Sequence, residues 1–276
     1  MNLIKQLQFD FRSGLTRVQY LIAIPIFLLS CLLAVTEIES YNICYSTLDL
    51  FLCSFAGSFP LFSDISEHEL QIPTIWFLII NGCLYINLDY VASELAISGI
   101  QRMVRCSRRH TWFVSKCIWI IASCVLYIAL ALLVILIVQI TMYGKVTYIP
   151  SIQVLNQLIK GITVHKYTIT ITDGVTIGVI LPLLTLITYS ILEFVLFMYT
   201  KPIISFMLGI VLQVIALCYQ SPFLVGNGAM VVRSSVLVSN GVTPSEIVAI
   251  TVGMNIILIV IGYFRFSQMD ILEVGE

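Results

Sequence analysis

Charge is what this sequence lacks most. Asp, Glu, Lys and Arg make up 11% of the 276 residues, against about 25% in an average soluble domain. Hydrophobic residues make up 59%, and the 14 basic and 15 acidic residues nearly cancel. Such a chain is predicted to be an integral membrane protein that contacts membrane lipid. The net charge itself implies nothing about nucleic acid, because in a membrane protein the position of each charge matters more than the sum. We expect no nucleic-acid partner.

Motifs of the common catalytic sites are also missing. The chain has no G-x-x-x-x-G-K-[ST] phosphate loop and no G-x-S-x-G nucleophile elbow. Its three histidines, His68, His110 and His165, are far apart and lack the H-E-x-x-H spacing of a zinc protease. We therefore expect no catalytic residue, no cofactor site and no metal site in this chain.

Long apolar runs predict the fold. A helix needs about 20 mostly apolar residues to cross the hydrocarbon core, and runs of this length favour helices over the short alternating strands of a membrane barrel. The predicted fold is an all-α integral membrane protein, a six-helix transmembrane bundle that forms a single domain over residues 1–276. The six runs are Val18–Val35, Ile72–Val91, Phe113–Tyr143, Gly174–Thr200, Pro202–Tyr219 and Ile247–Phe264.

The positions of Lys and Arg predict the orientation of this bundle. If both termini are cytoplasmic, ten basic residues lie inside and four lie outside, which fits the positive-inside rule. The inside set is Lys5, Arg12, Arg17, Arg102, Arg105, Arg108, Arg109, Lys116, Lys201 and Arg265, and the outside set is Lys145, Lys160, Lys166 and Arg233.

Two segments beside the runs have patterns of their own. In residues 1–17, Leu3, Leu7 and Phe11 recur four apart among polar residues, which predicts an amphipathic helix at the membrane interface. Residues 220–246 hold apolar patches interrupted by glycine and proline. This pattern predicts an external re-entrant segment of broken helices.

Other external residues give weaker signals. Residues 48–62 are apolar but interrupted, and are predicted to form a membrane-hugging or re-entrant element rather than a seventh span. The Thr and Ile residues of 167–174 favour extended chain. Gly174 and Gly178 fit the small-residue motif for helix contact.

Three side chains are candidates for local roles. Glu193 lies within the fourth run, where a charge costs about 2.5 to 3.5 kcal/mol, so it should face the interior, form a pair or be protonated. Either a place on a substrate path or a buried hydrogen bond would explain it. Cys44 and Cys53 share one external loop and form either a disulfide or two free thiols.

Positive charge is concentrated between the second and third runs, in residues 92–112. Four arginines lie within eight residues there, at Arg102, Arg105, Arg108 and Arg109. This concentration predicts either a topological anchor that contacts lipid phosphates or a docking surface for a partner.

The basic loop, the leading helix, the six runs and the broken helices together resemble the permease subunit of a bacterial type-2 ABC exporter. The most specific piece is SELAISGIQRMVRCSRRHTWFVSK. In that family a glutamate begins a segment that runs through a glycine and basic residues to a lysine, and Glu94, Gly99, Arg108 and Lys116 occupy those positions. Many relatives carry a proline shortly before the serine-arginine pair, where this chain has Arg105-Cys106-Ser107-Arg108.

The resemblance implies a function in a bacterial plasma membrane. The chain would export an amphipathic substrate, such as a peptide or a lipid-like molecule, together with two copies of an ABC ATPase subunit that bind ATP and Mg. A second permease copy or a related permease would complete the transporter. Residues 92–112 would be the cytoplasmic coupling loop, with Glu94, Gly99, Arg102, Arg105, Arg108, Arg109 and Lys116 as ATPase-coupling residues. The alternative is a non-transporting immunity or sensor protein that binds a peptide on its external loops.

Overall fold

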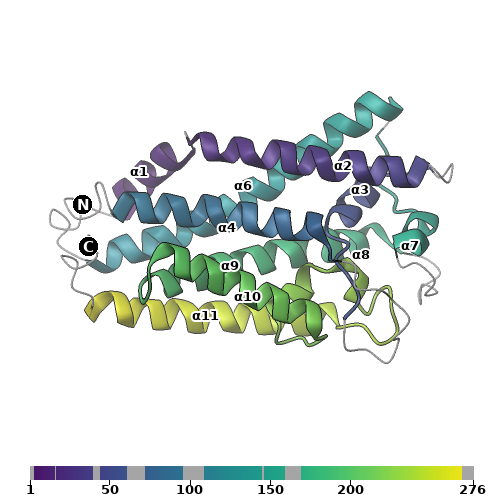
Figure 1. The fold of residues 1–276 in the computed structure, drawn as a ribbon. Helices are drawn as coiled ribbons and strands as arrows, with labels where there is room; N and C mark the ends of the chain where they lie inside the picture. The colour runs from purple at the N-terminus through teal and green to yellow at the C-terminus, as the bar shows by residue number, and fades with distance from the viewer. Residues whose placement is uncertain are drawn as a thin grey trace.

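A computed structural model describes residues 3–15, 17–39, 44–60, 72–95, 109–144, 146–158 and 169–268. In these ranges the chain forms a bundle of helices without β-strands, and the long helices run along one axis (Figure 1). The all-α prediction is confirmed for the described residues. The α-helices are α1 (Leu3–Leu15), α2 (Ala23–Glu39), α3 (Thr47–Ser54), α4 (Thr74–Glu94), α6 (Arg109–Tyr143), α7 (Ile152–Leu158), α8 (Ile171–Val175), α9 (Leu181–Phe197), α10 (Pro202–Cys218) and α11 (Pro244–Gln268). Shorter turns are η1 (Val18–Ile22), the π-helical η3 (Thr176–Ile180), η4 (Val225–Ala229) and η5 (Val231–Arg233).

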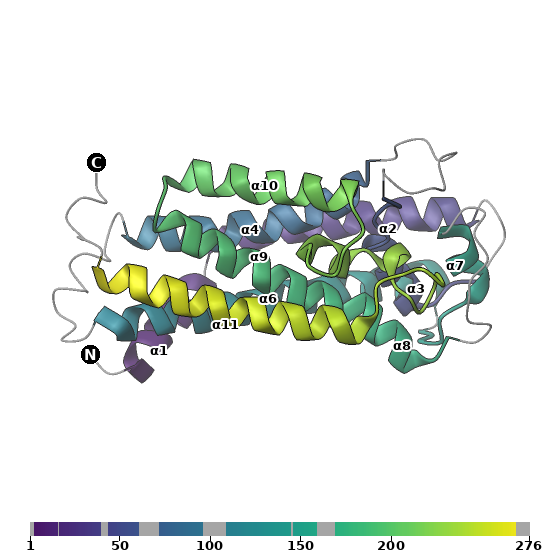
Figure 2. The ribbon, with the colours of Figure 1, turned by 90° about the horizontal axis from the view of Figure 1, so that it is seen from below.

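Five helical stretches are long and apolar enough to cross a membrane, judged by length and composition. They are Val18–Glu39, Thr74–Glu94, His110–Met142, Ile171–Phe197 and Pro244–Gln268. Helix α10 is also apolar and runs alongside α4 and α9 (Figure 2), but it has only 17 residues. It is about 25 Å long, somewhat less than the thickness of a typical hydrocarbon core. These helices support a multi-pass membrane protein, and the sixth span stays a prediction.

The outward faces of the long helices are apolar. Large side chains such as Leu28 of α2, Met207 of α10 and Ile256 of α11 are 41%, 55% and 59% exposed. A soluble protein rarely exposes apolar surface on this scale, because water penalises it. These faces suit contact with lipid chains.

Polar side chains lie between the helices. Asn81 of α4 and Gln213 of α10 exchange two amide hydrogen bonds, of 3.0 and 3.2 Å. Asn255 of α11 donates to the hydroxyl of Thr188 on α9, at 2.9 Å. Bonds of this kind hold membrane helices together where lipid offers no alternative partner.

The bundle has two distinct ends. At the α1 end lie α1, the C-terminal end of α4 and the start of α6; at the opposite end, here called the α3 end, lie α3, α7 and α8 (Figure 1). Helix α3 begins with a capping box between Ser46 and Asp49, and the carboxylate of Asp49 also accepts from the backbone N–H of Ser151, at 3.0 Å. Burial raises the pKa of Asp49, although these bonds oppose the rise.

The glycine pair at 174 and 178 packs directly against α3. A Cβ at Gly174 would lie 2.5 Å from Cδ2 of Leu48, and one at Gly178 would lie 2.9 Å from Cδ2 of Leu52. The two leucines are four residues apart, as are the two glycines. The motif therefore lets the start of the fourth helical stretch lie close to α3.

Replacing Gly178 by leucine is expected to lower stability by about 1–3 kcal/mol, because the added side chain overlaps Leu52. The matched control is Gly253→Leu in α11, where a Cβ would meet no atom within 4 Å. Thermal unfolding in detergent should show a lower midpoint for Gly178→Leu and a nearly unchanged one for Gly253→Leu. Equal midpoints for the two variants would contradict this packing.

One local prediction is wrong. Ile171–Gly174 is helical rather than extended, because Thr170 and Asp173 form a capping box that starts α8 and outweighs the β-branched residues. Cys44 and Cys53 are free thiols, which is one of the two alternatives left open by the sequence. Cys44 precedes α3, whereas Cys53 lies in its last turn.

The segment 220–246, predicted to be external, is folded against the α3 end mainly as short turns. The backbone N–H groups of Val231 and Val232 donate to the carbonyls of Phe55 and Ala56, at 3.0 and 3.1 Å. The indole of Trp76 donates to the carbonyl of Ala229, at 3.2 Å. The interruptions predicted in this segment are therefore present, and its depth in the membrane stays a prediction.

Arg233 ties this segment to the end of α10. Its buried guanidinium donates to the carbonyls of Ser58, Leu217 and Tyr219, at 2.7, 2.9 and 3.2 Å, and also to the carbonyl of Ala216 and the side chain of Asn227. The last carbonyls of a helix have no partner within it. One cation thus satisfies the C-terminal end of α10 and faces the negative end of its dipole.

Candidate functional site

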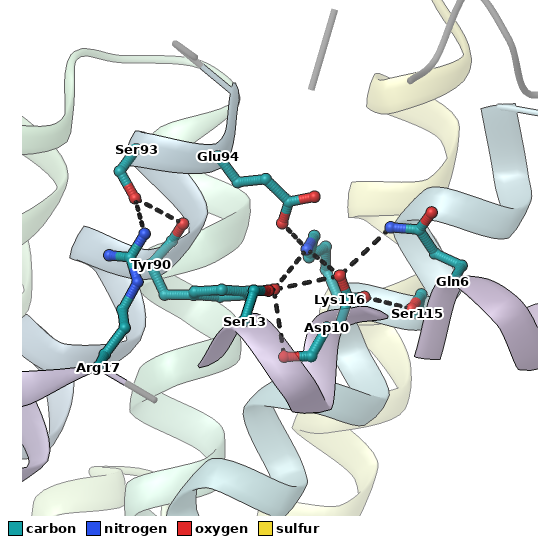
Figure 3. Close-up of polar contacts among 9 residues, drawn as sticks. All are labelled: Gln6, Asp10, Ser13, Arg17, Tyr90, Ser93, Glu94, Ser115 and Lys116. Carbon is teal, nitrogen blue, oxygen red and sulfur yellow. Dashed lines mark hydrogen bonds and ion pairs between the residues drawn. The ribbon is translucent and has the colours of Figure 1, made fainter. Parts of the chain in front are cut away.

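The structure places the predicted coupling residues in two groups. Gly99, Arg102, Arg105 and Arg108 lie outside the described residues, and Arg109 is the first residue of α6. Glu94 ends α4, and Lys116 lies two turns into α6. The structure brings Glu94 and Lys116 together at the α1 end of the bundle (Figure 3).

Lys116 forms ion pairs with two carboxylates. Its Nζ lies 2.8 Å from Oδ1 of Asp10 on α1, and it also pairs with Oε2 of Glu94. The side chains of Lys116 and Asp10 are fully buried, and that of Glu94 is 4% exposed. Because water is excluded, each of these charges depends on the others for compensation.

Hydrogen bonds complete the environment of the Asp10 carboxylate. The Tyr90 hydroxyl donates to Oδ1 at 3.1 Å, the Gln6 amide donates to Oδ1 at 3.2 Å, and the Ser115 hydroxyl donates to Oδ2 at 2.5 Å. The Lys116 ammonium also lies 4.5 Å from the centre of the Tyr90 ring, a favourable cation–π distance. The ionic cluster therefore consists of Gln6, Asp10, Tyr90, Glu94, Ser115 and Lys116 (Figure 3).

Helix α1 docks on the bundle through a polar stripe. Gln6, Asp10 and Gly14, each four residues apart, are its fully buried positions. A Cβ at Gly14 would lie 2.3 Å from Cζ2 of Trp119, so only glycine allows this approach to α6.

The apolar stripe predicted for residues 1–17 lies beside this docking face. Leu3, Leu7 and Phe11 are half-buried, and Phe11 meets the Trp119 ring edge-on at 5.4 Å. The amphipathic helix is thus present, but its most buried face is polar. This polar face is buried because Asp10 forms an ion pair with Lys116 on α6.

A second ion pair lies next to the cluster. Arg17 donates to Oδ2 of Asp89 at 2.7 Å and to the Ser93 hydroxyl at 2.6 Å, and the Gln19 amide donates to the same Asp89 oxygen at 2.9 Å. The side chains of Arg17 and Asp89 are 25% and 31% exposed, so solvent screens this pair and it contributes about 0–1 kcal/mol.

This geometry fastens three helices to one another. The cluster joins α1 to the last residue of α4 and to the first turns of α6, which are the two helices that flank residues 96–108. Within the described ranges, no group of three or more His, Cys, Asp or Glu side chains is arranged to hold a metal ion. Glu94 and Lys116 are buried, so they position the two helices that flank residues 96–108.

Sequence reasoning missed four of the six residues of this cluster. It selected Glu94 and Lys116 but treated Asp10 as one polar residue of an interfacial helix. The available signal was the four-residue spacing of Gln6, Asp10 and Gly14, which places two polar groups and a glycine on one helix face. Tyr90 lies one turn before Glu94, and no sequence pattern distinguishes it from other span tyrosines.

Glu193 lies away from the ionic cluster, within α9. It is 1% exposed, which agrees with the predicted interior position, and neither carboxyl oxygen has a hydrogen-bond partner in the described part of the chain. The structure therefore does not supply the buried hydrogen bond that was one of its two predicted roles.

A comparison of the chain with protein-family models gives no match, and a comparison with curated proteins gives no significant match.

Proposed function

We propose that this chain is the membrane permease subunit of an ATP-driven exporter. It works with two copies of a separate ABC ATPase subunit and a second permease, and it exports an amphipathic substrate such as a peptide or a lipid-like molecule. In this proposal the protein crosses a bacterial plasma membrane six times, with α10 as the fifth span. Residues 96–108 are the surface that meets the ATPase.

The observation that carries the proposal is the ionic cluster. In a transporter driven by a separate ATPase subunit, movement of the loop that binds the ATPase must be transmitted to the membrane spans. This requires a rigid connection between that loop and the spans. The buried pairs of Lys116 with Asp10 and Glu94 join both helices that flank residues 96–108 and add α1 to the same rigid unit. A movement applied to this loop would therefore tilt α4 and α6 together.

The distribution of charge supports the proposed orientation. Lys5, Arg12 and Lys201 are exposed and belong to elements at the α1 end of the bundle (Figure 1). At the α3 end, Arg233 is buried and bonded to carbonyls. Exposed cations at the α1 end fit a cytoplasmic location for that end.

Co-purification tests the proposal. The chain would be tagged, solubilised gently from its native membrane, and its partners identified by mass spectrometry, for the wild type and for the double variant Arg105→Glu, Arg108→Glu. We expect an ABC ATPase subunit to co-purify with the wild type and to be lost with the double variant. In this proposal the arginines meet acidic groups on the ATPase, and reversing their charge would repel those groups.

The control is Lys201→Glu, which reverses an exposed charge at the same end of the bundle but on the α9–α10 connection. It should keep most of the ATPase. Equal thermal midpoints for all three proteins establish that the variants fold. If the folded wild type brings down no ATPase, the proposal fails and the non-transporting immunity or sensor function takes its place.

A further inference from the structure

A second polar group lies inside the bundle, between α4, α6 and α9. The side-chain amide of Asn87 on α4 donates to the Ser190 hydroxyl on α9 at 3.0 Å. The same amide approaches Sγ of Cys124 on α6 at 3.5 Å and Sγ of Cys83 at 3.7 Å. All four side chains are buried, so this group is closed to water.

Glu193 belongs to this region of the bundle. It follows Ser190 by three residues on α9, which places both on the same helix face. It is also close enough to Cys83 to interact with it electrostatically. This neighbour on α4 is a thiol, and a second thiol, that of Cys124 on α6, lies 3.9 Å from it. Neither thiol supplies a positive charge.

Three acceptor oxygens in this region have no donor among the described residues. They are both carboxyl oxygens of Glu193 and Oδ1 of Asn87. Buried acceptors are almost always paired, and an ionised carboxylate in an apolar interior is especially costly without a partner. The unpaired, buried carboxyl group of Glu193 therefore indicates a missing cation.

The chemistry of the site favours a proton over an alkali or divalent metal ion. Hard cations require about six oxygen ligands, whereas this group offers the oxygens of Glu193, Asn87 and Ser190 beside two thiols. Within the described residues, no three of the usual metal-binding side chains converge. A proton needs only one carboxyl oxygen, and it removes the charge that burial penalises.

We propose that Glu193 binds a proton inside the bundle and that the interface of α4, α6 and α9 closes around a neutral carboxylic acid. The proton exchanges when these helices separate enough to admit water to the carboxyl. The inference does not depend on what binds residues 96–108, so it stands or falls separately from the proposed exporter function.

Infrared difference spectroscopy of the protein in lipid at neutral pH tests this assignment. Subtracting the spectrum of Glu193→Gln from that of the wild type should reveal a carboxylic acid C=O band, which shifts downward on exchange into D2O. The control is Glu246→Gln, whose parent carboxylate is exposed at the start of α11 and should contribute carboxylate bands instead. Carboxylate bands in the Glu193 difference spectrum would overturn the proposal.

Dicyclohexylcarbodiimide provides a measurement on the unmodified chain, in case Glu193→Gln fails to fold. This apolar reagent reacts with protonated carboxyl groups in membranes. Peptide mass spectrometry should find its adduct on Glu193 and not on Glu246. If sodium ions protect Glu193 while potassium ions do not, the site binds an alkali cation and the proton assignment is wrong. Absence of the adduct together with absence of the acid band would also overturn it.

Discussion

Replacing Lys116 by methionine is expected to destabilise the folded protein by about 3–5 kcal/mol, because the buried carboxylates of Asp10 and Glu94 lose the ammonium group that both of them pair with. Methionine keeps most of the volume of lysine, so the loss comes from charge rather than from a cavity. Thermal unfolding in detergent should show a strongly lowered midpoint. We also expect α1 to detach, so protease cleavage near residue 16 should become rapid.

The matched control is Lys201→Met, which removes one exposed lysine from the same end of the bundle and leaves the cluster intact. Its effect should stay within about 0.5 kcal/mol. A triple variant, Asp10→Asn, Glu94→Gln, Lys116→Met, removes all three charges together. It should recover most of the lost stability, since an uncharged cluster carries no uncompensated ion. A triple variant no more stable than Lys116→Met would contradict this electrostatic explanation.

Replacing Arg233 by methionine is expected to cost at least about 3 kcal/mol. The carbonyls of Ser58, Ala216 and Leu217 would lose the Arg233 donor, and a buried acceptor left unpaired costs about 1–3 kcal/mol. The end of α10 would also lose a cation that faces its dipole. We expect a lowered thermal midpoint and faster amide hydrogen exchange at the end of α10 and in η4 and η5.

Arg233→Lys separates charge from geometry. Lysine keeps the positive charge, but its single ammonium cannot reach the carbonyls on both sides as the planar guanidinium does. Its stability should fall between that of the wild type and that of Arg233→Met. Lys201→Met, which removes an exposed lysine, is the reference for loss of a surface charge. If Arg233→Met matched Lys201→Met, the carbonyl bonds of Arg233 would contribute nothing measurable.

The sequence predicted the main helices because their apolar runs are long and uninterrupted. It placed the starts and ends of α4 and α11 within a few residues of those observed. It failed at Ile171–Gly174, where the short-range bonds of Thr170 and Asp173 decide the conformation, although the β-branched residues favour strand. It left the pairing of Cys44 and Cys53 open, because sharing a loop says nothing about the helix in which Cys53 lies.

The ionic cluster was only partly predictable for a related reason. Glu94 and Lys116 were selected through a resemblance in local sequence, and the structure shows that they pair with each other. Their third partner, Asp10, is 84 residues before Glu94 in the chain, and its position depends on how α1 packs on α6. The hydrogen bond from Asn87 to Ser190 likewise depends on the packing of α4 against α9. Periodicity along one helix does not specify such contacts between helices.

Site-specific photo-crosslinking in living cells tests the central claim most directly. A photoreactive amino acid would replace Met103, which lies within residues 96–108 between the two helices that the ionic cluster joins. In the control it would replace Gln220, which is exposed at the α3 end. The account predicts a crosslink from position 103 to an ABC ATPase subunit and none from position 220. An ATPase crosslink from position 220 alone, or no ATPase crosslink from position 103 in the folded protein, would contradict it.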